Sequence, residues 1–378
     1  MRLLITEDFP PKEGGLQRWA FELARNFQIL GGPITVMARR ATLRNRVFDR
    51  RQSFSVWRMG GHDWNRYGHL YVAYYLAKFL LTTGIKPVVY ATNWKVGLVP
   101  VLLGSVARMK VIIGAHGLEI LKEKRGLRRR LIRMAFCRAH RGVAVSQYTR
   151  QTLIRLGVPE EQVVFIPNGV DVEIFRPREK STQLIHRYGL KGKKVILTLA
   201  RLVARKGQDQ VIKALPQVLG SVPQAVYVVV GQGHNQARLQ ELVRSLGLTG
   251  RVIFAGYVPD DELVDHYNLA DVYIMASREI EEQGDVEGFG ITFLEAGACQ
   301  VPVIGGRSGG IPDAILNGQT GLLVDPLDVG EIAEALISLL TDQDLAFRLG
   351  QRGRQRIVEQ LQWRQIARRF IRLERDGL

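Results

Sequence analysis

The stretch DVYIMASREIEEQGDVEGFGITFLEAGACQVPVIG (271–305) decides the fold of this chain. It holds two short apolar runs, at 271–277 and 301–305, separated by a polar loop and a segment with helical character. Apolar runs rich in Val and Ile, without polar alternation, are typical of strands buried on both faces of a parallel sheet. The stretch therefore predicts a strand–loop–helix–strand unit.

The same pattern recurs on both sides of a segment rich in Pro, Gly and charge at 166–181. Strands are expected at 3–6, 34–38, 88–91, 110–115 and 142–146, and again at 194–200, 225–231, 251–256, 271–277 and 301–305. Two such series in 378 residues predict an α/β protein with two doubly wound domains. We expect domains at 1–170 and 171–362, followed by a helix at 363–378 that crosses back to the first domain and carries Ile366, Phe370 and Leu373 on one face.

Charge is distributed unequally along the chain, whose formal net charge is +17. Residues 1–170 hold 28 Lys+Arg against 10 Asp+Glu, whereas residues 171–378 hold 25 against 26. A basic half predicts a polyanionic partner: nucleic acid, anionic lipid or a phosphorylated substrate. The chain has neither a zinc-ligand spacing nor an aromatic–basic alternation, so no nucleic-acid partner is expected.

Targeting signals and cysteines point to a cytoplasmic protein. The start MRLLITEDF breaks at Glu7 and Asp8, which predicts a first strand rather than a signal peptide. The apolar run from His69 is interrupted by Lys78 and falls short of the roughly 20 residues of a membrane span, so we expect a core helix. Cys137 and Cys299 match no metal spacing and are expected to be buried free thiols.

The segment EGFGITFLEAG (287–297) predicts a binding site. Glycine lets backbone approach a ligand, and the free N–H groups of a first helical turn bind anions. Glu295 lies about one and a half turns into the helix, where a ribose diol can meet it, and Glu287 lies just before the helix. This arrangement suits a nucleotide sugar. The alternative is that Glu287 only favours the helix N-terminus and that Glu295 is a solvated residue.

The stretch EGFGITFLEAGACQVPVIG (287–305) resembles the Glu–seven residues–Glu signature of retaining glycosyltransferases of family 4, and DVEGFGI is most similar to the phosphatidylinositol mannosyltransferases among them. Further stretches agree in the same order along most of the chain. They are PPKEGGLQRWAFELA (10–24), HG at 116, AVSQYTR (144–150), IPNGVD (166–171), ARLVARKGQD (200–209), VGQG (230–233), GYVPDDEL (256–263) and GGIPDAILNGQTGLLVDP (309–326). The resemblance implies the GT-B fold, in which two Rossmann-like domains face each other across a cleft.

The resemblance also implies roles for single residues. Arg201 and Lys206 bind the diphosphate and stabilise the charge that grows as it leaves, Glu295 binds the ribose and Glu287 the hexose. His116 approaches the transferred sugar, so that the catalytic set is His116, Arg201, Lys206 and Glu287. The donor-binding set is Gly14, Gly15, Arg201, Lys206, Gly231, Gly233, Val258, Glu287, Gly288, Phe289, Gly290, Ile291 and Glu295, with Ser146 and Asn168 as weaker candidates. VGQG is not read as a nicotinamide motif, because Gln236 replaces the third glycine.

The expected chemistry is retaining and independent of metal. The Asp-x-Asp pair Asp342 and Asp344 lies in a helical C-terminal region rather than at a strand end. Arg201, Lys206 and the helix N-terminus are expected to replace a metal, and no cofactor is required besides the nucleotide-sugar donor. A donor phosphate oxygen is expected to accept the proton of the acceptor.

The resemblance assigns the acceptor to the basic first half. The segment 118–141 is expected to form a basic amphipathic helix on an anionic membrane surface. Most of its interleaved apolar residues can share one stripe; they are Leu121, Leu127, Leu131, Ile132 and Ala135. The membrane-facing cations are Lys122, Lys124, Arg125, Arg128, Arg129, Arg130 and Arg133. A second cluster, Arg39, Arg40, Arg44, Arg46, Arg50 and Arg51, is assigned to a loop. The alternative is that the apolar stripe packs on the core of its own domain.

The expected protein is a peripheral enzyme of the inner face of the cytoplasmic membrane, with a lipid-linked or glycan acceptor in the synthesis of cell-envelope polysaccharide or glycolipid. GDP-mannose, UDP-glucose, UDP-galactose and UDP-N-acetylglucosamine all remain possible donors. Two alternatives are a nucleotide-sugar epimerase of the same fold and a non-catalytic protein that binds anionic surfaces.

Overall fold

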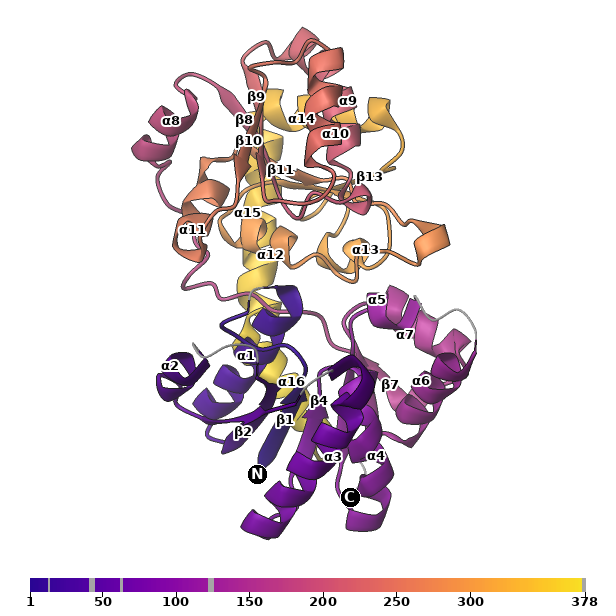
Figure 1. Ribbon diagram of the computed structural model, residues 1–378. Coiled ribbons are helices and arrows are strands. Elements are labelled where there is room, and N and C mark those ends of the chain that lie inside the picture. The colour runs from indigo at the N-terminus through magenta and orange to yellow at the C-terminus, as the bar shows by residue number, and fades with distance from the viewer. Residues whose placement is uncertain (13, 41–44, 62–63, 122–125, 376–378) are drawn as a thin grey trace. The chain divides into compact units, whose positions relative to one another are not determined.

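The computed structural model describes residues 1–12, 14–40, 45–61, 64–121 and 126–375. It divides into two compact units, each built on one parallel sheet (Figure 1). Unit 1 comprises Met1–Asn168 and Trp363–Leu378, and unit 2 comprises Gly169–Gln362. The chain therefore leaves unit 1 after Asn168 and re-enters it at Trp363.

The sheet of unit 1 has the strand order β3-β2-β1-β4-β5-β6-β7. Its strands are β1 (Arg2–Thr6), β2 (Ile34–Arg39), β3 (Ser55–Met59), β4 (Val88–Ala91), β5 (Val111–Ala115), β6 (Arg141–Ala144) and β7 (Val163–Phe165). Its described α-helices are α1 (Gly15–Ile29), α2 (Asn45–Arg50), α3 (Trp64–Thr83), α4 (Trp94–Ala107), α5 (Leu118–Leu121), α6 (Leu127–Arg138), α7 (Gln147–Arg155) and α16 (Trp363–Leu373).

Helices cover both faces of this sheet, which is why its central strands are mostly apolar. Helices α1 and α16 cover one face, where Trp19, Phe27 and Phe370 are buried. Helices α3, α4 and α6 cover the other face. As predicted, the terminal helix α16 buries Ile366, Phe370 and Leu373 on one side.

The sheet of unit 2 has the strand order β10-β9-β8-β11-β12-β13. Its strands are β8 (Lys194–Leu199), β9 (Ala225–Val230), β10 (Val252–Gly256), β11 (Val272–Met275), β12 (Val303–Gly306) and β13 (Leu322–Val324). Its α-helices are α8 (Thr182–Tyr188), α9 (Gln208–Ser221), α10 (Gln236–Ser245), α11 (Asp260–Leu269), α12 (Ile291–Ala298), α13 (Ile311–Ala314), α14 (Val329–Thr341) and α15 (Gln343–Gln360).

The opening stretch folds as predicted, because β11, α12 and β12 follow one another and the two strands are parallel neighbours. Three strands, β3, β7 and β13, were not predicted from the sequence. SVWRM in β3 carries the polar residues Ser55 and Arg58 and lies at the sheet edge, and β7 and β13 have three residues each. Short or edge strands leave little periodic signal in a sequence.

Other expectations about unit 1 are corrected. The segment 118–141 is not one helix, because α5 ends at Leu121 and α6 begins after Gly126, whose φ is 91°. The basic cluster assigned to a loop contains α2. Helix α3 is not a core helix, since Val72 and Leu76 are buried whereas Leu70 and Leu81 are exposed. Cys299 is a buried free thiol as expected, but Cys137 is only partly buried.

Candidate functional site

The switch in strand order of unit 2 falls between β8 and β11, since the chain turns to opposite sides of the sheet from these neighbouring strands. Open α/β sheets bind ligands outside the carboxyl ends of their strands at such a point. The loop after β8 carries Arg201, Arg205 and Lys206, and the loop after β11 carries Asp285 and Glu287. The fold thus brings the predicted Arg201, Lys206 and Glu287 to one edge, together with Arg205 and Asp285, which were not predicted.

A buried ion cluster joins the two loops. Lys206 Nζ lies 2.5 Å from Glu287 Oε2, and Arg205 Nη1 lies 2.6 Å from the same oxygen. Arg205 Nε also pairs with Asp285 Oδ1 at 3.0 Å. The side chains of Arg205, Lys206 and Glu287 are 8%, 10% and 13% exposed, so the cluster is shielded from solvent and is held in one arrangement.

Burial and pairing act in opposite directions on Glu287. Burial by itself raises the pKa of its carboxyl, but the neighbouring Lys206 and Arg205 outweigh that effect and lower the pKa to about 2. Burial lowers the pKa of Lys206, and Glu287 opposes that shift. Glu287 is therefore an anion at neutral pH, fixed between two cations, and the view that it only favours a helix N-terminus is wrong.

Arg201, which was predicted to bind the diphosphate together with Lys206, has a different environment. Arg201 is exposed, whereas Lys206 is buried and bound to Glu287. Arg201 nevertheless lies near enough to Lys206 to lower its pKa. The site thus has two fixed cations, Arg205 and Lys206, and one solvent-facing cation, Arg201, for an anionic ligand.

The N-terminus of α12 lies at the same edge. Gly290 precedes the helix with a φ of 90°, a conformation that favours glycine, and a side chain there would overlap the ring of Phe293. No side chain caps this terminus and no acid occupies its first turn. Phe289 and Gly290 are buried, and Gly288 and Ile291 are partly buried. Uncapped N–H groups of a first turn are suited to an anion.

Glu295 is buried rather than solvated, with 4% of its surface exposed. Its Oε2 accepts a hydrogen bond of 2.6 Å from the hydroxyl of Tyr267 on α11. The interpretation of Glu295 as a solvated helical residue is wrong. Ribose binding by this carboxylate stays a prediction, and one of its oxygens already has a partner.

The predicted nucleotide loop after β9 is explained largely by its own packing. A side chain at Gly231 would overlap the carbonyl oxygen of Ala200, and one at Gly233 would overlap that of Leu202. The backbone of Leu202 exchanges hydrogen bonds with this loop, donating to Gln232 O at 3.0 Å and accepting from Asn235 N at 3.1 Å. These glycines are required without any ligand. Val258, the predicted base contact, is buried.

In unit 1, His116 follows β5 at the carboxyl edge of the sheet. Its side chain is partly buried, and its Nε2 is buried without a hydrogen-bond partner among the described residues. Burial lowers its pKa to about 4, although a hydrogen bond to the backbone of Thr92 opposes the shift. The ring lies edge-on to Trp19, with centroids 4.8 Å apart, and the backbone N–H of His116 donates to Glu119 Oε1 at 2.6 Å. His116 is a neutral imidazole held in place, with one nitrogen left to accept or donate.

The other predicted residues of unit 1 divide into two kinds. Ser146 caps α7 by accepting a hydrogen bond from Thr149 N at 3.1 Å, which explains it structurally. A side chain at Gly14 would overlap Gln17, whereas one at Gly15 would meet nothing within 4 Å. Asn168 Oδ1 is buried and has no partner among the described residues. Helix capping therefore explains Ser146, and a φ of 145° explains Gly14, whereas neither contact nor conformation explains Gly15 or Asn168.

Arg205 and Asp285 also belong to the site, although the sequence did not indicate them. Arg205 stands next to Lys206 in ARLVARKGQD, but a neighbour in sequence usually points elsewhere, so its pairing with Glu287 was not evident. Here the residues form a short 3-10 helix (Ala204–Lys206), and both cations reach the carboxylate. The acid-rich loop 278–286 was the only signal for Asp285.

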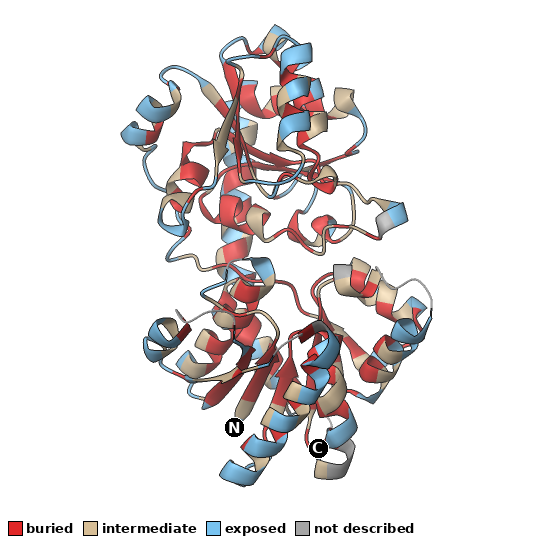
Figure 2. Ribbon diagram, in the orientation of Figure 1, coloured by how far each residue is buried: buried red, intermediate tan, exposed pale blue. Residues whose placement is uncertain are grey.

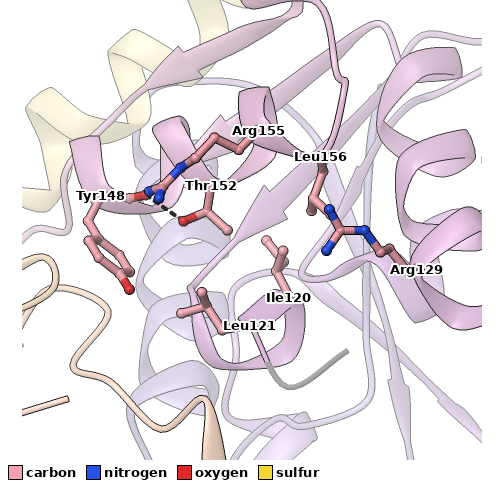
Figure 3. A pocket seen from close by; sticks show the side chains of 7 residues that line it. All are labelled: Ile120, Leu121, Arg129, Tyr148, Thr152, Arg155 and Leu156. Atoms are coloured by element: carbon pink, nitrogen blue, oxygen red, sulfur yellow. Dashed lines mark hydrogen bonds between the residues drawn. The ribbon is translucent and has the colours of Figure 1, made fainter. Parts of the chain in front are cut away.

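The basic surface of unit 1 is only partly described, because Lys122, Lys124 and Arg125 lie outside the described residues. On α6, Arg128, Arg129, Arg130 and Arg133 are exposed, while Ile132 and Ala135 pack into the core. Figure 3 shows a pocket of about 290 Å³ beside this helix. No predicted donor-binding residue lines it. Its lining residues are Ile120, Leu121, Arg129, Tyr148, Thr152, Arg155 and Leu156.

Two further features bear on ligands. Within the described ranges, no group of three or more His, Cys, Asp or Glu is placed to hold a metal ion. Asp342 caps α15 by accepting a hydrogen bond from Leu345 N at 2.8 Å, in the helical region where it was expected.

No helix in the described part of the chain has the length and apolar character to cross a bilayer.

Known families and proteins resemble this chain over nearly its whole length. The description Glycosyltransferase Family 4 matches residues 13–174, and Glycosyl transferases group 1 matches residues 181–356. The GDP-mannose-dependent alpha-(1-6)-phosphatidylinositol monomannoside mannosyltransferase of Mycolicibacterium smegmatis is 34% identical, covering 98% of this chain and 97% of that protein. The GDP-mannose-dependent monoacylated alpha-(1-6)-phosphatidylinositol monomannoside mannosyltransferase of Corynebacterium glutamicum is 30% identical, with 98% and 97% covered.

Among solved structures, Anabaena Alr3699/HepE in complex with UDP superposes with a TM-score of 0.83. The identity is 22%, and the match covers 99% of this chain and 100% of that one. At this identity the likeness concerns the fold.

Proposed function

Because this chain belongs to glycosyltransferase family 4 and has the GT-B fold, we propose that it transfers mannose from GDP-mannose to a glycolipid acceptor, with retention of configuration and without a metal ion. It moves a sugar from a nucleotide sugar, as its relatives are named for doing. The choice of GDP-mannose and of a phosphatidylinositol mannoside-like acceptor rests on those names. We place its work in glycolipid or polysaccharide synthesis at the inner face of the cytoplasmic membrane.

The observation that carries the proposal is the cluster of Arg205, Lys206 and Glu287 beside the uncapped N-terminus of α12. Cations and free N–H groups suit a diphosphate, and the fixed carboxylate suits sugar hydroxyls. The exposed Arg201 would add a second charge to the diphosphate. Since Arg205, Lys206 and Glu287 are already held by one another, they can stabilise the leaving group with little reorganisation.

The proposed step breaks the bond between the sugar C1 and the diphosphate oxygen and forms a bond between C1 and the acceptor oxygen on the same face. The acceptor proton passes to the departing diphosphate oxygen. Positive charge develops on the sugar and negative charge on the diphosphate. Lys206 and α12 oppose the second charge, and the ionised Glu287 holds the sugar hydroxyls, so no nucleophile of the chain is needed.

The experiment measures transfer from GDP-mannose, UDP-glucose, UDP-galactose and UDP-N-acetylglucosamine to vesicles that contain a phosphatidylinositol mannoside, with and without a chelator. We expect GDP-mannose to be used, the chelator to have no effect and the new linkage to be α. Use of a UDP-sugar alone, loss of activity with the chelator or a β product would each overturn one part of the proposal. Epimerised donor without transfer would indicate the epimerase alternative.

Glu287→Gln tests the role of the carboxylate. Turnover should fall about 100-fold while donor affinity changes only a few-fold, because the hydroxyl contacts matter most in the transition state. Glu282→Gln changes an exposed acid of the same loop and should behave as wild type. Full turnover of Glu287→Gln would contradict the assignment.

A further inference from the structure

Helix α3 exposes an apolar stripe that its own unit does not cover. Tyr67, Leu70, Tyr74 and Leu81 are 39%, 55%, 60% and 86% exposed. Their spacing of three, four and seven residues places them within an arc of roughly 60° at 3.6 residues per turn. Figure 2 shows exposed residues along this helix. Ile85, just beyond the helix, is 43% exposed.

The opposite side of α3 is already used for packing. Trp64, Val72, Leu76 and Phe79 are at most 4% exposed and belong to the core between the helix and the sheet. The helix therefore has two apolar sides, which is why its sequence indicated a core helix. Large contiguous apolar surfaces exposed to water mark interaction sites.

The charged side chains that α3 itself contributes are all positive, although Glu7 accepts a hydrogen bond from Trp64 at the start of the helix, on its packed side. No Asp or Glu occurs from Trp64 to Leu118, whereas Arg66, Lys78 and Lys86 are exposed on α3 and the turn after it. A second copy of the same face would bring these cations together, which disfavours self-association. Cations attract an anionic lipid surface, and tyrosine is favoured at the boundary between head groups and acyl chains.

From this combination we infer that the outer face of α3 docks on an anionic lipid surface. Tyr67, Leu70, Tyr74 and Leu81 enter the head-group boundary, while Arg66 and Lys78 remain among the phosphates. This differs from docking by the apolar stripe of α6, of which Ile132 and Ala135 are buried in the core. On α6, Leu127 is 71% exposed and could still contact a lipid surface.

Docking by α3 would hold the enzyme at the membrane that contains the proposed glycolipid acceptor. This biological role rests on the proposed function, whereas the docking itself is argued from α3 alone. Docking is measurable with no donor or acceptor present. Failure of docking and failure of transfer are therefore distinguishable.

The test is co-flotation of the full chain with vesicles of phosphatidylcholine alone or mixed with phosphatidylglycerol, at low and high salt. Wild type should partition to the anionic vesicles at low salt, and Leu70→Gln/Leu81→Gln should do so at least about tenfold less, because two exposed leucines lose their apolar contact. Leu327→Gln/Phe347→Gln changes two exposed apolar residues of unit 2 and should match wild type.

Three outcomes would overturn the inference. The α3 variant binding as well as wild type would exclude this face, and so would loss of binding only in Arg128→Gln/Arg129→Gln/Arg130→Gln on α6. A lipid-free dimer that dissociates in the α3 variant would show that the face joins two copies. A thermal shift with GDP-mannose, retained in both double variants, shows that they are folded and reports separately on the donor.

Discussion

The candidate ligand-binding residues at the carboxyl edges of the two sheets differ in charge and in how they are held. In unit 2 the functional candidates are charged and already paired, with Glu287 held between Arg205 and Lys206. In unit 1 they are uncharged: His116 is a neutral imidazole with an unpartnered Nε2, and Gly15 faces open space. The edge of unit 2 can therefore bind a ligand through fixed charges, whereas the edge of unit 1 can bind one through shape and single hydrogen bonds.

The largest expected effect tests this contrast directly. Lys206→Met should lower turnover about 100- to 1000-fold, because one cation opposing the leaving-group charge is removed from a buried site. His116→Asn should lower it only about tenfold, the loss expected for one neutral hydrogen bond. Turnover of each variant at saturating donor gives the comparison.

Lys213→Met is the matched control, since Lys213 is an exposed lysine on α9. It should retain wild-type turnover. Equal losses in Lys206→Met and His116→Asn would break the contrast between a charged and a neutral edge.

A second prediction separates the glycines of the two edges. Gly231→Ala should destabilise the protein by about 2–3 kcal/mol, because Gly231 has a φ of 126° and its side chain would overlap Ala200. Gly15→Ala should change stability by no more than about 1 kcal/mol, since it begins a helix and has free space around it. Denaturant unfolding checks both.

Activity adds a second readout to this pair. If a ligand approaches Gly15, the Gly15→Ala variant should be stable yet impaired in transfer. A stable Gly15→Ala variant with full activity would show that no ligand approaches there, and a stable Gly231→Ala variant would contradict the packing account.

The smallest effect concerns pH. Because His116 has a folded-state pKa of about 4 against an ordinary 6.5, the unfolded chain binds its proton first as the pH falls. The protein should therefore lose about 2 kcal/mol of stability through this group between pH 6.5 and 4. Chemical unfolding at pH 7 and pH 4.5 should show a smaller loss for His116→Asn than for wild type.

His234→Asn changes an exposed histidine and should keep the wild-type pH dependence. An unchanged pH dependence in His116→Asn would mean that the imidazole binds its proton as readily in the folded protein as in the unfolded chain. That result would contradict the lowered pKa of His116 and the burial that causes it.

Much of the fold could be predicted because its signals are local. Buried parallel strands are continuous apolar runs, and ten such runs appear as strands at nearly the predicted places. The face of α16 followed from its periodicity. The three missed strands are short or at an edge, where a few residues carry no period.

The candidate site was harder to predict because its geometry depends on residues far apart in sequence. That Arg205 meets Glu287, 82 residues away, follows from the adjacency of β8 and β11 and not from either motif. Gly231 and Gly233 show the opposite difficulty. Their glycine motif suggested a ligand, but the neighbouring backbone leaves no room for a side chain at either position. The two apolar sides of α3 gave one continuous hydrophobic pattern, so the sequence could not separate a packed face from an exposed one.

The return of the chain to unit 1 has a consequence for synthesis on the ribosome. Residues 169–362 of unit 2 are complete before α16 emerges, and α16 contributes Trp363, Ile366 and Phe370 to the core of unit 1. Since domains fold as units during translation, the second unit can finish first, while the first waits with part of its apolar face open. Although synthesised first, unit 1 is the last to be completed, and a nascent chain lacking its final helix would present that open face to chaperones.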